Sequence, residues 1–166
     1  MELAEAAARA DALAREPGNE RELATLRSQW DDELEAAARD ADYRVRGRAF
    51  RAVGQFRFRQ KLELLRRGLE DESAAARGSA LIALTTLSAD HPGDVNSYRP
   101  ALNELAMRDP NPAVRRLAIL CLRNGTPDRG TIQLLEGVAG DDETDRDVRE
   151  AARAVAAALV KKARAR

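Results

Sequence analysis

A turn followed by an apolar–Arg pair and an apolar helical face is the feature that most constrains this chain. In the copy at residues 109–122, Pro110 and Pro112 each lack an N–H and bias the preceding residue away from helix, so no helix continues through them. Asn111 can cap the helix that follows, with Pro112 at its favoured first position. That helix then repeats apolar residues at spacings of three and four, which makes one apolar face. The face consists of Val114, Leu117, Ala118, Cys121 and Leu122.

The same arrangement recurs along the chain. The apolar–Arg pairs are Val45-Arg46, Ala76-Arg77, Val114-Arg115 and Val148-Arg149, at spacings of 31, 38 and 34 residues. A turn acid precedes each of the first three pairs, namely Asp40, Asp71 and Asp109. Helical units that recur at this spacing predict stacked helical pairs, in which each pair buries its apolar surface against its neighbours.

This pattern resembles the HEAT repeat, especially its short bacterial form, over roughly residues 20–163. The Asp-Pro-x-Pro-x-Val-Arg run at 109–115 is the most specific match. Three departures are visible: Ala76 replaces a Val, Gly47 and Gly78 follow the Arg, and the fourth turn is longer by two residues. The resemblance implies antiparallel helical pairs stacked into a curved solenoid that usually binds other macromolecules. It also implies that the repeated Arg bonds the turn Asp of a neighbouring repeat.

We therefore expect an all-α fold, an α-solenoid of about four HEAT-like helical hairpins plus an N-terminal helix. The chain is predicted to be a single domain over residues 1–166, with a capping helix in 1–18 and the repeats in 19–163. Asn19 is expected to cap the second helix, and Gly125 to end a helix in a left-handed cap. Residues 88–98 are expected to form the longest irregular connection.

The composition and charge of the chain limit the classes of partner that we expect. The formal net charge is zero, which argues against a general nucleic-acid binder. Of the 28 basic residues 25 are Arg, which suggests a GC-rich bacterial genome. The single cysteine excludes an intrachain disulfide, the acidic N-terminus is unlike a signal peptide, and no apolar run approaches ~18 residues. We expect a cytoplasmic protein that does not bind a membrane.

The sequence predicts no catalytic, cofactor-binding or metal-binding residue. The acidic turn at 141–147 does not fit a calcium loop, because Arg146 stands where Gly is required and Ala152 where a bidentate Glu is required. His91, the only histidine, has no partner ligand in the sequence, and Cys121 lies on an apolar face without a base. Trp30 beside Asp31 could suggest a DNA alkyl-base glycosylase, but one Trp on a neutral chain favours a packing role.

The stretch from 43 to 61 is rich in Arg and Phe and contains no acid. Arg44, Arg48 and Arg51 share one helical face. Residues 1–42 carry a net charge of −7 and residues 43–68 a net charge of +8. Three interpretations remain open: a solvated basic face opposed to the acidic N-terminal helices, a docking face for an acidic protein partner, and a nucleic-acid surface that stacks bases on aromatic rings.

A second candidate surface lies six residues after the Val or Ala of each pair. These positions are Arg51, Ile82, Leu120 and Ala154. At 100° per residue they point away from the core face. Ile82 and Leu120, edged by Arg48, Arg116 and Arg123, would form an apolar strip beside the space left by Gly47 and Gly78, unless local curvature buries it.

The function expected from these features is that of a non-catalytic adaptor or scaffold. It would bind a protein partner with an acidic, helical or extended segment on the concave face of the solenoid. The alternatives are nucleic-acid binding through the 43–61 face, and a role as a subunit of a lyase or enzyme complex, since some short bacterial HEAT-like proteins act in pairs as chromophore lyases. The candidate partner-binding residues are Arg44, Arg48, Arg51, Ile82, Arg116, Leu120 and Arg123.

Overall fold

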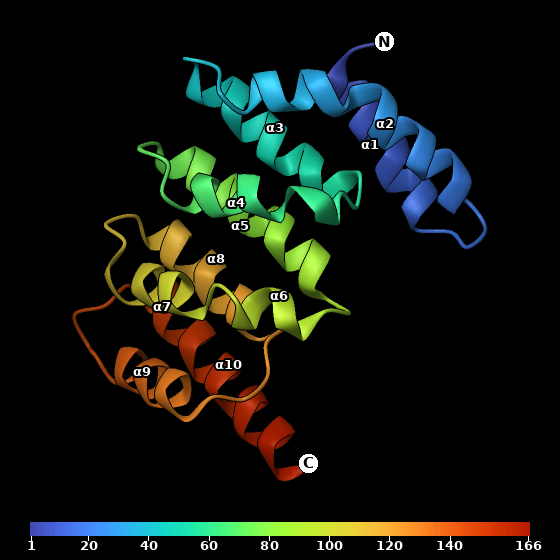
Figure 1. Ribbon diagram of the computed structural model, residues 1–166. Helices are drawn as coiled ribbons and strands as arrows, with labels where there is room; N and C mark the ends of the chain where they lie inside the picture. Colours follow the sequence, from blue (N-terminus) through green and yellow to red (C-terminus); the bar gives the residue numbers. More distant parts are fainter. The chain divides into compact units, whose positions relative to one another are not determined.

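The computed structural model describes residues 1–166, which form ten α-helices, one short 3-10 helix and no strand (Figure 1). The predicted all-α fold is confirmed. In chain order the elements are α1 (Leu3–Ala14), α2 (Glu20–Ala37), α3 (Tyr43–Gln55), η1 (Arg59–Lys61), α4 (Leu62–Leu69), α5 (Ala74–Ser88), α6 (Pro92–Asn96), α7 (Arg99–Arg108), α8 (Pro112–Leu122), α9 (Arg129–Ala139) and α10 (Arg146–Arg164).

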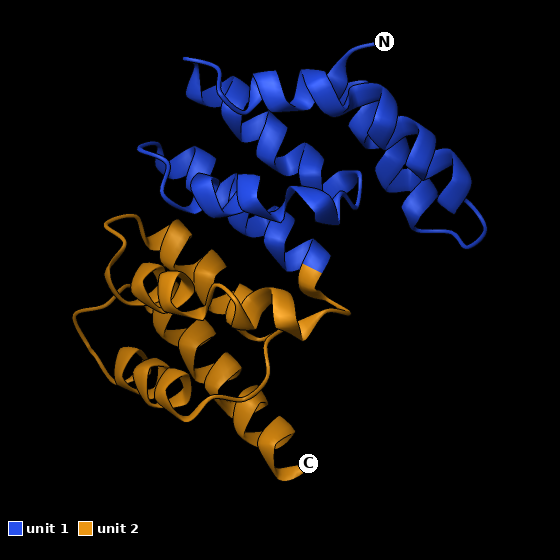
Figure 2. Ribbon diagram, in the orientation of Figure 1, with its two compact units in different colours: residues 1–87 blue, residues 88–166 orange.

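The helices form two compact units, Met1–Leu87 and Ser88–Arg166 (Figure 2). In the first unit α2 pairs with α3 and α4 packs beside α5, while α1 contacts both α2 and α3. In the second unit α7 pairs with α8 and α9 with α10. There α7 also contacts α9, and α8 contacts α10, so first helices pack on first helices and second on second. The four helical pairs expected from the repeat are present.

Glycine and alanine bring the helices of the first unit close together. A Cβ atom added to Gly54 of α3 would lie 2.8 Å from the Cα atom of Ala83 in α5. A Cβ added to Gly68 of α4 would lie 2.8 Å from the Cβ atom of Ala80. Atoms cannot pack at that distance, so a side chain at either position would push the helices apart. The buried ring of Phe50 also lies against Gly68, 3.2 Å from the position of an added Cβ atom.

Helix α8 follows the predicted pattern with one difference. Asn111 caps it, because its Oδ1 atom accepts hydrogen bonds from the backbone N–H groups of Ala113 and Val114 at 2.9 and 3.2 Å. Leu122 is buried as expected, but Leu117 is half-buried and Ile119 is fully buried. The buried arc is turned toward Ile119 because α8 packs against both α7 and α10 rather than against a single neighbour.

Two predicted helix ends are wrong. Asn19 precedes α2, but its side-chain amide donates to the Leu13 carbonyl of α1 at 3.0 Å and does not cap α2. Gly125 does not adopt the left-handed conformation. Glycine is required at position 125 for another reason: a Cβ atom there would lie 2.8 Å from Cγ1 of Val95. Val95 is buried in α6, a short helix inside the segment expected to be irregular.

The end of α3 contains a strained residue that the sequence did not indicate. Arg57 is the only non-glycine residue with a positive φ, 52°. The Phe58 N–H donates to the Val53 carbonyl and the Arg57 N–H to the Gly54 carbonyl, which is the Schellman arrangement normally made with Gly. The Arg57 guanidinium also donates to the Gly54 carbonyl at 2.8 Å and to Asp11 of α1 at 2.9 Å. These bonds offset the strain of the backbone.

None of the helices combines the length and the apolar character that crossing a membrane requires.

The first prediction concerns the core of α8. Leu122→Ala should lower the free energy of unfolding by about 2–5 kcal/mol, because it leaves a cavity at a buried site. Leu120→Ala removes the same atoms from a partly exposed position two residues earlier and should cost clearly less. Urea denaturation followed by circular dichroism measures both. Equal losses in the two variants would contradict the helix orientation.

The second prediction concerns Arg57. Arg57→Ala keeps the left-handed backbone but loses the guanidinium bonds, and should lower the free energy of unfolding by about 1–3 kcal/mol. Arg57→Gly loses the same bonds yet relieves the strain, so it should be more stable than the Ala variant by about 1 kcal/mol. The comparison uses thermal and urea unfolding. A glycine variant no more stable than the alanine variant would show that the left-handed conformation is not strained.

Candidate functional site

Each of the four turns between paired helices is closed by an aspartate. Its side chain accepts a hydrogen bond from the backbone N–H two residues later, at 2.8 to 3.0 Å. The pairs are Asp40 with Asp42, Asp71 with Ser73, Asp109 with Asn111 and Asp141 with Glu143. The fourth member, Asp141, was missed because its turn is longer. Its position 32 residues after Asp109 could have revealed it.

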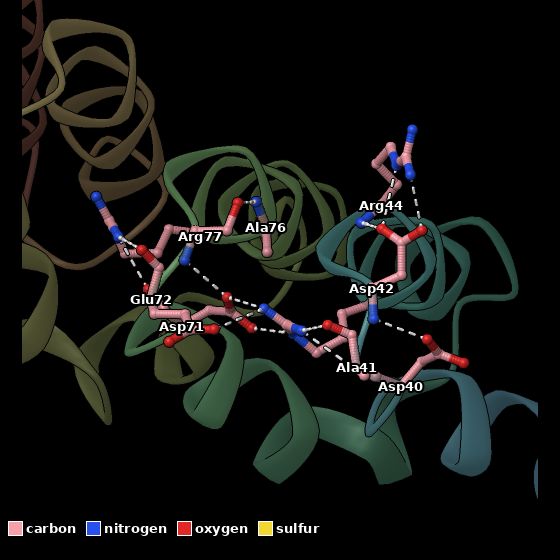
Figure 3. A network of polar contacts seen from close by, with 10 residues as sticks. Asp40, Ala41, Asp42, Arg44, Asp71, Glu72, Ala76 and Arg77 are labelled. Atoms are coloured by element: carbon pink, nitrogen blue, oxygen red, sulfur yellow. Dashed lines mark hydrogen bonds and ion pairs between the residues drawn. The ribbon is translucent and has the colours of Figure 1, made fainter.

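Arg46 connects the first of these turns to the second; Asp40, Ala41 and Asp71 of the two turns are labelled in Figure 3. Its Nε and Nη2 atoms donate to the two carboxylate oxygens of Asp71 at 2.8 and 2.9 Å. Its Nη1 atom donates to the carbonyl oxygens of Asp40 and Ala41, both at 3.0 Å. The Arg46 and Asp71 side chains are only 13% and 8% exposed. The implied bond from the repeated Arg to a neighbouring turn Asp is confirmed here, so this Arg has a structural role.

The repeated arginines Arg77, Arg115 and Arg149 make contacts that differ from those of Arg46. Arg77 donates to the carbonyls of Asp71 and Glu72, as Arg46 does to its own turn. Arg115 donates to the Ala106 carbonyl at 3.0 Å, not to a turn carboxylate. An Nη1 atom of Arg149 lies 3.7 Å from Asp142. The bidentate bond between Arg46 and Asp71 is therefore not reproduced at Arg115 and Arg149.

Much of the basic stretch is neutralised within the protein. Lys61 lies 2.6 Å from Asp31 and 2.8 Å from Glu35, both on α2, and its hydrogen bond lowers the pKa of Glu35. Arg57 binds Asp11 of α1, and Arg44 binds Asp42 at its own helix start. These contacts favour the interpretation in which the basic stretch faces the acidic N-terminal helices.

Arg48 and Arg51 are the exception on the predicted basic face. Both side chains are exposed on α3, and neither forms an ion pair or a hydrogen bond within the protein. They lie beside a groove of about 500 Å³ in the first unit, formed by α1, α2 and α3. Half-buried Leu3 and Val45 contribute apolar surface to it. Val45 corresponds in the repeat to Val114 of the apolar face, but the structure leaves it partly open because the groove runs beside it.

The apolar positions of the second helices differ between α5 and α8. Ile82 of α5 is 37% exposed, whereas Leu120 of α8 is partly buried. Arg116 and Arg123, which the sequence placed beside Leu120, are exposed. Gly47 does not leave open space as expected, because a Cβ atom there would lie 3.3 Å from the hydroxyl of Ser79 in α5. Full burial of Ile82 by local curvature is excluded.

The remaining candidates have ordinary structural environments. No group of three His, Cys, Asp or Glu side chains is placed to hold a metal ion. In the acidic turn, Asp141 binds the Thr144 hydroxyl at 2.9 Å and Asp145 caps α10, so these carboxylates serve the turn and the helix start. Cys121 is fully buried and His91 is exposed.

Comparison with known proteins agrees with the repeated turns. The family model for HEAT repeats matches residues 32–96 and 89–157, which include all four apolar–Arg pairs. A search of curated proteins finds no match to the chain.

The third prediction concerns the bond between Arg46 and Asp71. Asp71→Asn should lower the free energy of unfolding by about 3 kcal/mol, because it leaves the Arg46 charge without its partner at a mostly buried site. Glu72→Gln is the matched control. Its carboxylate is 91% exposed and lies 3.8 Å from Arg46, so the change should have little effect.

The same bond should make stability depend on pH. The hydrogen bond from Arg46 holds the pKa of Asp71 below its ordinary value. A carboxyl with a depressed pKa in the folded state stabilises the protein above its unfolded pKa, and this stability is lost as pH falls through the folded value. Unfolding measured from neutral pH to below about pH 4 should therefore show a smaller acid-induced loss in Asp71→Asn than in the wild type. Parallel pH profiles would contradict the assignment.

Proposed function

The chain belongs to the HEAT-repeat family, and we propose that it is a non-catalytic adaptor or scaffold that binds a protein partner through its second helices. HEAT repeats commonly mediate protein interactions as scaffolds, and HEAT-repeat solenoids are typically non-catalytic. The proposed binding residues lie on α3 and α5 in the first unit and on α8 in the second. They are Arg44, Arg48, Arg51, Ile82, Arg116, Leu120 and Arg123.

The single observation that carries this proposal is the exposure of Ile82. Solvent favours a polar residue at an exposed helical position, yet this large apolar side chain is 37% exposed on α5. Scattered apolar residues are normal on a surface, but this one occupies the repeat position predicted to point away from the core. A partner that covered Ile82 would bury apolar surface without displacing any residue of the core.

Binding of nucleic acid through residues 43–61 has weaker support. Phosphate binding requires basic side chains that are free to replace counterions. Lys61, Arg57 and Arg46 are instead held by carboxylates of the protein itself. The three phenylalanine rings of this stretch are also inaccessible, since Phe50, Phe56 and Phe58 are buried, and Tyr43 is its one exposed aromatic residue.

The fourth prediction tests the binding surface with two sets of variants. The tagged chain is used to capture partners from its native host, and each captured protein is purified and measured by biolayer interferometry. Arg44→Glu, Arg48→Glu and Arg51→Glu together should slow association, because rim charges act mainly on the association rate. Ile82→Asp with Leu120→Asp should abolish binding, because each change places a charge at an apolar position of a second helix. Helical content should remain that of the wild type in both sets.

Two results would overturn the proposal. One is a purified partner that binds both sets of variants as tightly as it binds the wild type. The other is a captured species that nuclease treatment removes and whose affinity falls steeply with salt, which would identify nucleic acid as the ligand.

A further inference from the structure

We propose that the groove formed by α1, α2 and α3 binds an acidic amphipathic helix of a protein partner. This inference deepens the proposed function and rests on it, since it names the class of partner and one place where the partner is held. Three observations support it: the apolar surface of the groove, the free arginines of α3, and the carboxylates contributed by α1 and α2.

The groove offers apolar surface that the fold leaves uncovered. It has a volume of about 500 Å³ and is lined in part by Leu3, Ala4 and Val45. Leu3 and Val45 are half-buried and Ala4 is exposed. A volume of this size lies in the range of about 300–1,000 Å³ typical of ligand sites. Grooves between helices commonly receive the apolar face of another helix, whose side chains enter at spacings of three and four residues.

The charge on α3 specifies an acidic partner. Arg48 and Arg51 line the groove, are exposed and have no intramolecular partner. They are three residues apart on one helix, so their side chains are neighbours on its surface. Two carboxylates three or four residues apart on a partner helix have the same spacing. A guanidinium can bind each of these carboxylates through two parallel hydrogen bonds.

The carboxylates of the groove argue against a phosphate backbone as the ligand. Glu2 of the α1 start and Glu33 of α2 line the same groove. They would repel a continuous row of phosphates, which has no positive charge to offer them. A protein helix can present acids toward Arg48 and Arg51, aliphatic residues toward Val45, and a neutral or basic residue toward Glu33.

The fifth prediction uses the whole chain as bait for a random peptide library displayed on phage. Enriched peptides should contain two acidic residues three or four positions apart with aliphatic residues between them. An enriched peptide is then synthesised with a fluorescent label, and its affinity is measured by anisotropy. Exchanging its acids for the corresponding amides should weaken binding about tenfold or more, the loss expected from two rim ion pairs of ~0.7 kcal/mol each.

Variants of the protein test the groove directly. Arg48→Glu with Arg51→Glu should weaken peptide binding by at least about tenfold. Ala4→Trp should have a similar effect, because the new ring occupies the groove from an exposed position of α1. The matched control is Arg21→Glu with Arg67→Glu. It makes the same charge change at two exposed arginines of the same unit that do not line the groove. The control should retain wild-type affinity, and thermal unfolding should be unchanged in all variants.

The outcomes separate this inference from the broader function. Peptides that bind the Arg48→Glu/Arg51→Glu variant normally but lose binding with Ile82→Asp and Leu120→Asp would overturn the groove and leave the adaptor function standing. Enrichment of basic peptides, or of none, would also overturn the groove. Single-stranded DNA that binds the wild type and is lost with the arginine pair, but not with the control pair, would assign the groove to nucleic acid instead.

Discussion

The guanidinium group of Arg46 joins two consecutive helical pairs. It lies in the first turn of α3, where the carbonyls of Asp40 and Ala41 precede the helix and have no helical N–H to bind. One side of Arg46 satisfies these carbonyls, and the other forms a bidentate bond with Asp71 in the next turn. Arg46 therefore stabilises the turn before its own helix and also sets the position of the following helical pair. This double use explains why a short motif can specify both a local turn and a tertiary contact.

The rest of the packing depends on close approach more than on large side chains. Aromatic residues make up only 4% of the chain, so the cores are built mainly from alanine and aliphatic residues. Small faces bury little area per residue, and they stabilise a fold only when the helices come close enough for dense contact. Gly54 and Gly68 permit that approach. Gly125, in the chain that follows α8, likewise permits close approach to Val95 of α6.

The sequence predicted the helices well and the contacts between them less well. Helical periodicity, prolines and the Asn111 cap are local signals, so the cap of α8 and its first residue, Pro112, were predicted correctly. The roles of Gly125 and Arg57 depend on Val95 and Asp11, which are distant in sequence, so no local pattern indicates them. Asn19 binds the Leu13 carbonyl at the end of the preceding helix, a partner that the capping pattern does not indicate. The exposure of Ile82 agreed with its helical phase. Val45 had the phase of a core residue, yet it lines a groove whose existence depends on α1.

The distribution of charge shows why a strongly basic segment need not be a general phosphate-binding surface. Lys61 and Arg57 are drawn to carboxylates of α1 and α2, and each such bond makes the cation less available to an external ligand. The arginines that remain available are Arg48 and Arg51, which form no ion pair although Glu2 and Glu33 line the same groove. In the proposed complex, two free arginines beside apolar surface would recognise spacing and shape as well as charge. On that proposal a neutral chain discriminates among acidic partners without attracting every polyanion.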